Sequence, residues 1–199
     1  MEQVKGFKNS WILTEKGKVK TNLLIENGKI ARIGDFECDG LIELPEDQII
    51  IPGFIDQHIH GAAGSDAMDG TIEDLSKIAC ALAKEGTTAF LATTMTQSPE
   101  NIDKALTAVK EYIESKPENG AEILGVHLEG PFISKDFIGA QPLEYVAAPC
   151  VEVFKHYEEV SGNNIKLVSM AVEVEGAEDL VSYLASKGIV ASIGHSNAK

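Results

Sequence analysis

The feature that most restricts the fold of this chain is a regular alternation of short strand-like runs and amphipathic helical segments after residue 52. Short apolar runs bounded by turn residues are typical of buried strands, and apolar positions spaced three and four apart indicate helices. The predicted strands cover residues 53–58, 87–93, 121–128, 165–172 and 189–194. The predicted helices cover residues 71–85, 99–114, 150–159 and 177–187. Strands that alternate with helices in this way predict a parallel sheet covered by helices.

The first fifty residues follow a different pattern. Residues 19–25 and 29–34 are strand-like, and Asn27-Gly28 between them is a strong hairpin signal because both residues tolerate positive φ. A further strand is expected over residues 40–44. We therefore predict a small module of short antiparallel strands at residues 1–51, followed by an α/β domain at residues 52–199.

Charge and cysteine content argue against several classes of partner. The chain has 17 basic and 31 acidic residues and a net charge of −14, whereas nucleic-acid grooves and anionic membrane surfaces are bound by clustered Lys and Arg. We therefore expect no nucleic-acid partner and no membrane partner. Three widely spaced cysteines and a polar N-terminus without an apolar leader are typical of a cytoplasmic protein.

Four side chains that bind metals well lie at the ends of predicted strands. His58 and His60 form a His-x-His pair, and on a strand this spacing places both imidazoles on the same face. Glu129 follows a run that should be buried, where a carboxylate is costly without a cation or several donors. His195 closes the last strand. Imidazole and carboxylate together suit Zn²⁺ or Fe²⁺, so the set points to metal-assisted hydrolysis.

Each of these residues also has a simpler interpretation. His58 and His60 could be an ordinary pair of hydrogen-bonded histidines near a strand end. Glu129 would also suit a salt bridge to a Lys or Arg elsewhere, and His195 alone would be an ordinary core or surface histidine. Their matching positions at the ends of the first, third and fifth strands favour one common site, because a parallel barrel collects residues from several strand ends.

Three further groups are less decisive. His127 lies two residues before Glu129 on the same face, and is a metal-site partner, a substrate contact or a satisfied core histidine. Gln141 lies in the long loop over residues 130–148, a candidate lid that could place a side-chain amide over the metal. The threonines that flank the second strand, at positions 87, 88, 93, 94 and 96, are interpreted as β propensity in preference to a functional role.

Five parallel strands fit two architectures. One is an open doubly wound sheet, which a chain of 199 residues could complete. The other is an eight-stranded (β/α)₈ barrel of which the first five strands are present. Periodicity does not separate them. A glycine-rich phosphate motif is missing after the first strand, which weakens the dinucleotide-binding version, and the strand-end ligands favour the barrel.

Four motifs together resemble the N-acetylglucosamine-6-phosphate deacetylases of the amidohydrolase superfamily. The motifs are Pro52-Gly-Phe-Ile-Asp-Gln-His-Ile-His-Gly61, His127-Leu-Glu-Gly-Pro-Phe-Ile133, Gly139-Ala-Gln141 and Gly194-His-Ser196. The first is shared widely in the superfamily, whereas His-Leu-Glu-Gly-Pro-Phe is much more specific to the deacetylases. The resemblance covers essentially the whole chain, but about the first half of the family's usual length.

The resemblance implies a metal-dependent (β/α)₈ TIM-type barrel with a small β-sandwich module built from both chain ends. The reaction would remove acetate from N-acetyl-D-glucosamine 6-phosphate to give D-glucosamine 6-phosphate in amino-sugar catabolism. Glu129 and His195 would bind the principal metal, and His58 and His60 match positions that hold a second metal in some members. The cofactor would be Zn²⁺ or Fe²⁺, with one or two ions per full-length subunit of a homodimer.

The resemblance also implies where the substrate is held. Ala140, Gln141 and His127 would contact the amino-sugar phosphate. Many members carry His at the position of Gln141 to polarise the substrate carbonyl; a Gln amide can donate a hydrogen bond there but cannot carry a proton. The family's third ligand of the principal metal and its catalytic aspartate would lie beyond Lys199, so residues 1–199 alone are expected to be inactive.

Two other functions stay open at this point. Another amidohydrolase, acting on cyclic amides, would usually bridge its metals with a carboxylated lysine, whereas Glu129 has the comparable role here. A non-catalytic, truncated barrel would leave open sheet edges and would tend to aggregate. A screen of cyclic amides beside the sugar phosphate would separate the two enzymes.

Overall fold

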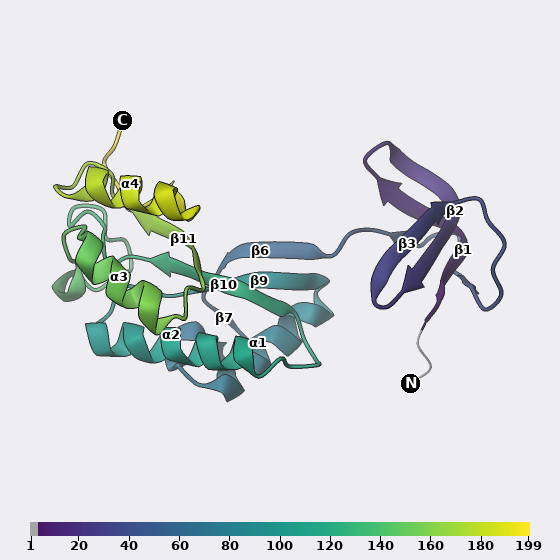
Figure 1. The fold of residues 1–199 in the computed structure, drawn as a ribbon, viewed down its shortest axis with the longest axis horizontal. Coiled ribbons are helices and arrows are strands. Elements are labelled where there is room, and N and C mark those ends of the chain that lie inside the picture. Colours follow the sequence, from purple (N-terminus) through teal and green to yellow (C-terminus); the bar gives the residue numbers. More distant parts are fainter. Residues whose placement is uncertain (1–3) are drawn as a thin grey trace. The chain divides into compact units, whose positions relative to one another are not determined.

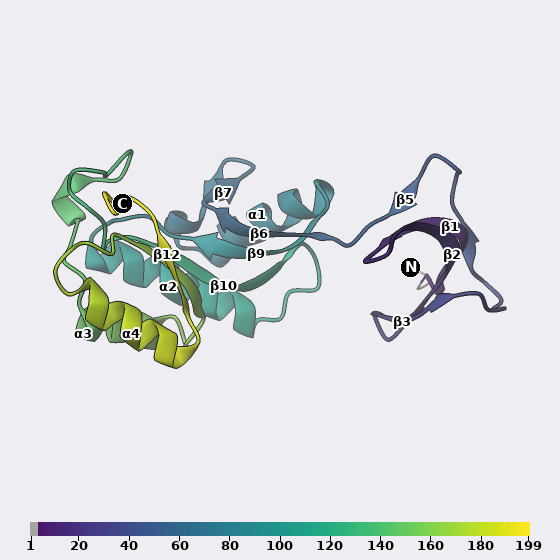
Figure 2. The ribbon, with the colours of Figure 1, turned by 90° about the horizontal axis from the view of Figure 1, so that it is seen from above.

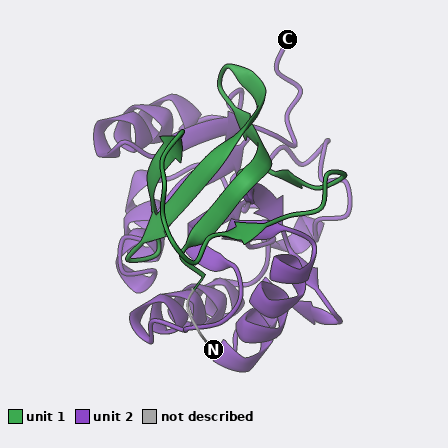
Figure 3. Ribbon diagram, turned by 90° about the vertical axis from the view of Figure 1, so that its right-hand side faces the viewer, with its two compact units in different colours: residues 1–52 green, residues 53–199 purple. Residues whose placement is uncertain are grey.

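The structure of the protein, a computed structural model, describes residues 4–199. The chain divides into two compact units, Met1–Pro52 and Gly53–Lys199, which Figure 3 colours green and purple. The division coincides with the change from a hairpin pattern to a strand-and-helix pattern, so each unit has its own kind of sheet.

The first unit contains one five-stranded sheet. Strands β1 (Gly6–Thr14), β2 (Gly17–Glu26) and β3 (Lys29–Gly34) pair antiparallel in that order. Strands β4 (Ile42–Glu43) and β5 (Ile49–Ile50) instead pair with β1 in parallel. The expectation of antiparallel strands throughout is therefore wrong for these two. The chain after β3 crosses back and runs beside β1 in the same direction.

The hairpin between β2 and β3 follows the turn chemistry of the sequence. Asn27 and Gly28 adopt φ values of 53° and 73°, which is the left-handed pair that a tight two-residue turn requires. Strand β1 was not predicted from the sequence. Its register shifts between Phe7 and Ser10, and Asn9 between them has a φ of 47°. Such a bulge interrupts the alternation of polar and apolar residues that identifies a strand.

The second unit is built on a parallel sheet of five strands in chain order. The strands are β6 (Phe54–Ile59), β9 (Thr87–Thr93), β10 (Glu122–Glu129), β11 (Ile165–Met170) and β12 (Val190–Ile193). Each pairs in parallel with the next. A doubly wound sheet reverses its strand order midway, whereas a barrel never does. The prediction of five consecutive barrel strands is confirmed, and Figures 1 and 2 show the curled sheet.

Four helices connect these strands. They are α1 (Ile72–Lys84), α2 (Pro99–Glu114), α3 (Val151–Val160) and α4 (Ala177–Lys187). Thr71 and Ser98 cap α1 and α2 by accepting hydrogen bonds from the backbone N–H groups of Asp74 and Asn101. The N–H groups of the first turn have no carbonyl partner within the helix, and the capping side chains supply one. None of the helices within residues 4–199 has both the length and the apolar content that a bilayer crossing requires.

Short elements fill the longer loops. Strands β7 (Gly61–Ala62) and β8 (Ser65–Asp66) form a small hairpin after β6, followed by the 3₁₀ turn η1 (Ala67–Asp69). A second 3₁₀ turn, η2 (Leu143–Tyr145), lies in the loop before α3.

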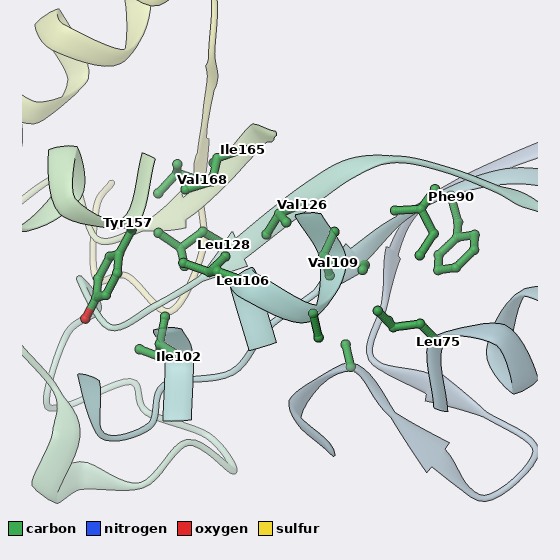
Figure 4. Close-up of a cluster of buried hydrophobic side chains, with 14 of the residues drawn as sticks. Leu75, Phe90, Ile102, Leu106, Val109, Val126, Leu128, Tyr157, Ile165 and Val168 are labelled. Atoms are coloured by element: carbon green, nitrogen blue, oxygen red, sulfur yellow. The ribbon is translucent and has the colours of Figure 1, made fainter. Parts of the chain in front are cut away.

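One cluster of buried side chains joins the helices to one face of the sheet. It includes Leu106 of α2, Leu128 of β10 and Val168 of β11, all without exposed surface. Figure 4 shows these side chains between the helices and the strands. Because side chains alternate along a strand, the residues between these core positions point to the opposite face. On β10 those residues are His127 and Glu129.

Ionisation of Tyr157 on α3 is expected to destabilise the protein at alkaline pH. The side chain is 2% exposed, and burial, with the carboxylates of Asp103 and Glu100, raises its pKa to about 12. In an unfolded chain the pKa of tyrosine is about 10. The contribution of Tyr157 to the free energy of unfolding is therefore fully present below about pH 10 and is lost as the pH rises from there towards about 12.

Urea unfolding in mildly and strongly alkaline buffer measures this effect. Tyr157→Phe should lose less free energy of unfolding between the two conditions than the wild type does. Tyr145→Phe, on the turn η2, is the matched control and should lose as much as the wild type. Identical losses in all three proteins would show that Tyr157 is not the group that titrates.

Candidate metal centre

Three imidazoles surround one carboxylate at the C-terminal ends of the barrel strands. Glu129 is the last residue of β10, and its Oε1 lies 3.4 Å from His58 Nε2 and 3.3 Å from His195 Nε2. Its Oε2 lies 3.2 Å from His60 Nε2. The ligand atoms of His58, His60 and Glu129 all lie within 4.8 Å of one another. The structure therefore brings the four predicted ligands together around Glu129.

The other nitrogen of two of these rings is held by a backbone carbonyl. His60 Nδ1 lies 3.2 Å from the carbonyl of Thr93, and His195 Nδ1 lies 2.9 Å from the carbonyl of Phe137. A carbonyl oxygen only accepts, so each Nδ1 carries a proton. In the neutral ring Nε2 then presents a lone pair to the carboxylate, and that contact is favourable only with a proton or a cation between the two. This is the arrangement in which metal-binding histidines are oriented.

Electrostatics point the same way. Burial acts to raise the pKa of Glu129, but the hydrogen bond from His60 and the charges of His58, His60 and His195 outweigh it and hold the pKa at about 2. In turn, the hydrogen bond to Glu129 raises the pKa of His60 against the opposing effect of burial. Glu129 is therefore ionised at physiological pH, which binding of a divalent cation requires, and the cation would take the place of the protons that the imidazoles otherwise share with it.

His127 lies next to this group but does not face Glu129 as the other imidazoles do. Its side chain is 2% exposed, with Nε2 2.8 Å from Ser169 Oγ and Nδ1 3.1 Å from the carbonyl of Gln57. Burial and the charge of His58 lower its pKa to about 4, so the ring is neutral at physiological pH. The ring centroids of His127 and His58 are 4.7 Å apart in an edge-to-face arrangement. This geometry suits a support for His58, and contact with a substrate stays a prediction.

Gln141 reaches the same carboxylate from the long loop after β10. It is 4% exposed, and its Nε2 donates to Glu129 Oε2 over 3.0 Å. Its Oε1 accepts from the backbone N–H of Thr96 over 2.6 Å. Ala140, the residue before it, is exposed. The structure places the Gln141 amide on Glu129, a predicted metal ligand, and a role in holding substrate stays a prediction for both residues.

The loop over residues 130–148 is tied to the site at more than one point. The backbone N–H of Ser134 donates to the carbonyl of His195 over 2.9 Å, and Phe137 accepts from the His195 ring as described above. At its start, Gly130 has a φ of 71°, and a Cβ there would lie 2.0 Å from Thr96 Oγ1. A larger residue would therefore displace either Thr96 or the turn that follows Glu129.

Two contributing residues were missed in the sequence. Thr93 was assigned β propensity alone, yet its Oγ1 accepts from the backbone N–H of Ile59 over 2.9 Å and its carbonyl holds His60. Ser169 lies beside His127. The alternation of side chains along a strand could have identified both residues. Their neighbours Ala92, Val168 and Met170 belong to the core cluster on one face of the sheet. Thr93 and Ser169 must then lie on the face that carries Glu129.

Comparisons with known proteins agree with this geometry. The family model described as "Amidohydrolase family" matches residues 49–190. The N-acetylglucosamine-6-phosphate deacetylase of Bacillus subtilis (strain 168) is 39% identical over 194 residues, which cover 94% of this chain and 49% of that protein. The deacetylase of the same name from Lysinibacillus sphaericus is 43% identical over 176 residues, which cover 87% of this chain and 45% of that protein.

A solved structure gives the same result. The crystal structure of N-acetylglucosamine-6-phosphate deacetylase from Thermotoga maritima superimposes with a TM-score of 0.81 at 33% sequence identity, covering 97% of this chain and 49% of that one. The chain spans about half the length of the curated relatives that it matches. Since the family model matches well over half of the residues, and the fold and strand-end ligands agree with it, the chain belongs to the amidohydrolase family.

Proposed function

We propose that this chain carries the metal site of a deacetylase that removes acetate from N-acetyl-D-glucosamine 6-phosphate to give D-glucosamine 6-phosphate. The observation that supports the proposal most is the carboxylate of Glu129 with three imidazole Nε2 atoms within 3.4 Å. The relatives at 39% and 43% identity carry the name of this enzyme. A cyclic-amide hydrolase is the less favoured alternative, because such enzymes usually bridge their metals with a carboxylated lysine, whereas Glu129 would have the comparable role here.

In this proposal one or two divalent ions, Zn²⁺ or Fe²⁺, would be held by His58, His60, Glu129 and His195. When bound, such an ion lowers the pKa of a water molecule to about 7 and polarises the oxygen of an amide. Glu129 is the natural shared ligand, because its two oxygens face different imidazoles. His60 and His195 are held in the ligating tautomer by the carbonyls of Thr93 and Phe137.

The chain's own residues would then orient the reactants. His127 packs edge-to-face against the ring of His58 and so supports it. Because its lowered pKa keeps His127 neutral, it adds no positive charge beside the metal. Ala140 is exposed and precedes Gln141, which is bonded to Glu129, so the amino sugar would bind beside Ala140 in this proposal. Gln141 would contact the substrate with the second N–H of its amide, because the first donates to Glu129. Neutral His127 has a single N–H, which donates to the carbonyl of Gln57, so its proposed substrate contact would use Nε2 as an acceptor.

The experiment is an assay of acetate release by the metal-loaded natural gene product and, in parallel, by residues 1–199. N-acetylglucosamine 6-phosphate should be hydrolysed much faster than N-acetylglucosamine without the phosphate, and cyclic amides should be inert. Turnover of a cyclic amide, with no acetate released from the sugar phosphate, would contradict the proposal. Light scattering on the same preparation tests the further proposal, which rests on the family resemblance, that the subunits form a homodimer. A cytoplasmic location is proposed on the same ground.

A further inference from the structure

We infer that Gln141 is a positioning residue that fixes the rotation of the Glu129 carboxylate and thereby the affinity of the site for metal. The inference rests on the proposed function only in taking Glu129 as a metal ligand. The inference concerns how the Glu129 side chain is held. The strand-end motifs do not imply this role, and neither does the substrate-polarising role that the family resemblance implies at the position of Gln141.

A chain of two hydrogen bonds carries the inference. The backbone N–H of Thr96 donates to Gln141 Oε1 over 2.6 Å, and Gln141 Nε2 donates to Glu129 Oε2 over 3.0 Å. Thr96 is fully buried, and Gln141 and Glu129 are only 4% and 5% exposed. Buried bonds of this kind are costly to leave unmade, so the three groups hold one another in place.

The backbone decides which way the Gln141 amide points. An N–H group can only donate, so the oxygen of the amide must face Thr96 and its NH₂ group must face Glu129. The oxygen and nitrogen of a side-chain amide look alike, but here the choice between them is fixed. The flipped amide would place its NH₂ group against the N–H of Thr96, so that two donors would face each other. The carbonyl oxygen of Gln141 is committed to the protein, and the amide acts as a donor to a negative group.

The donor determines which carboxylate oxygen faces which imidazole. Oε2 of Glu129 receives Gln141 and lies near His60, which leaves Oε1 directed at His58 and His195. Without that donor the carboxylate could rotate and lose one of these alignments. Partners of this kind, one bond removed from the metal, typically change metal affinity by about 10–100-fold.

The same loop also holds His195, so it supports both ligands. Gln141 and Phe137 both belong to the loop over residues 130–148, and the Phe137 carbonyl accepts from His195 Nδ1 over 2.9 Å. The backbone N–H of Gln141 is itself bonded to the carbonyl of Ile138 over 2.9 Å. The loop that the sequence suggested as a lid is therefore, in this inference, the scaffold of the metal site.

The test is the metal affinity of two variants, measured by titration of residues 1–199 with Zn²⁺ or Co²⁺ against a competing chelator. Gln141→Met keeps the length of the side chain but removes both polar groups. Gln141→Asn keeps the amide but is one methylene shorter, so it cannot bridge Thr96 and Glu129. Both should bind metal about 10–100-fold more weakly and should change the visible spectrum of bound Co²⁺. Gln97→Leu, in the loop before α2, is the matched control and should bind as the wild type does.

The outcomes are separable from those of the proposed function. Weakened metal binding in every variant that folds, with unchanged binding in the control, supports the inference whether or not acetate is released. A folded variant that binds metal as tightly as the wild type overturns it. A variant of the natural gene product with normal metal affinity and a raised KM for the sugar phosphate also overturns it, because Gln141 would then be a substrate contact.

Discussion

Glu129→Gln is expected to strip the natural gene product of its metal and to reduce its acetate release to background. The substitution keeps the shape of the side chain but removes the charge that the three imidazoles face. Loss of a direct ligand should weaken binding by more than the approximately 100-fold seen when only a supporting residue is lost. Metal content after dialysis, measured by plasma mass spectrometry, and acetate release check the two effects together.

Glu122→Gln is the matched control for this substitution. Glu122 is the first residue of β10 and is exposed, whereas Glu129 is the last residue of the same strand and is buried. The control should keep its metal, its activity and its stability. If Glu129→Gln kept as much metal as Glu122→Gln, the carboxylate at the centre of the three imidazoles could not be a ligand.

Leu106→Ala is expected to lower the free energy of unfolding by about 3 kcal/mol. Leu106 lies on α2 without exposed surface and packs between the helices and the sheet that carries the site (Figure 4). The loss combines the transfer of apolar atoms with the cavity that they leave behind. Urea unfolding monitored by circular dichroism measures it.

Thr107→Ala, the exposed neighbour on the same helix, is the control and should change stability by less than about 0.5 kcal/mol. The folded Leu106→Ala protein should still bind metal, because Leu106 lies in the core on the far face of the sheet from Glu129. Equal stability of the two variants would mean that this cluster is not the core that holds the helices to the sheet.

The barrel sector could be predicted because its signals are local. The capping threonine and serine before α1 and α2, and the short apolar runs of the strands, depend only on neighbours in the chain. The ligands followed from one further step, since strand ends of a parallel sheet share an edge. Strand β1 and the parallel pairing of β4 and β5 were not predicted, because a bulge and a long crossover leave no periodic signal.

The support of the site could not be predicted in the same way. The contacts of Thr93 with His60 and of Gln141 with Glu129 join residues on different elements. They depend on the register of neighbouring strands and on the path of a long loop, which single-sequence patterns do not determine. Sequence reasoning therefore found the candidate ligands but assigned Gln141 to the substrate and Thr93 to strand propensity.

The most direct test of the central claim is anomalous diffraction from crystals of the protein loaded with Zn²⁺, recorded at the zinc absorption edge. The account predicts one or two peaks beside the Glu129 carboxylate, each about 2.0–2.2 Å from ligating atoms of the set His58, His60, Glu129 and His195. A peak elsewhere in the molecule, or no peak in crystals whose protein releases acetate, would contradict it.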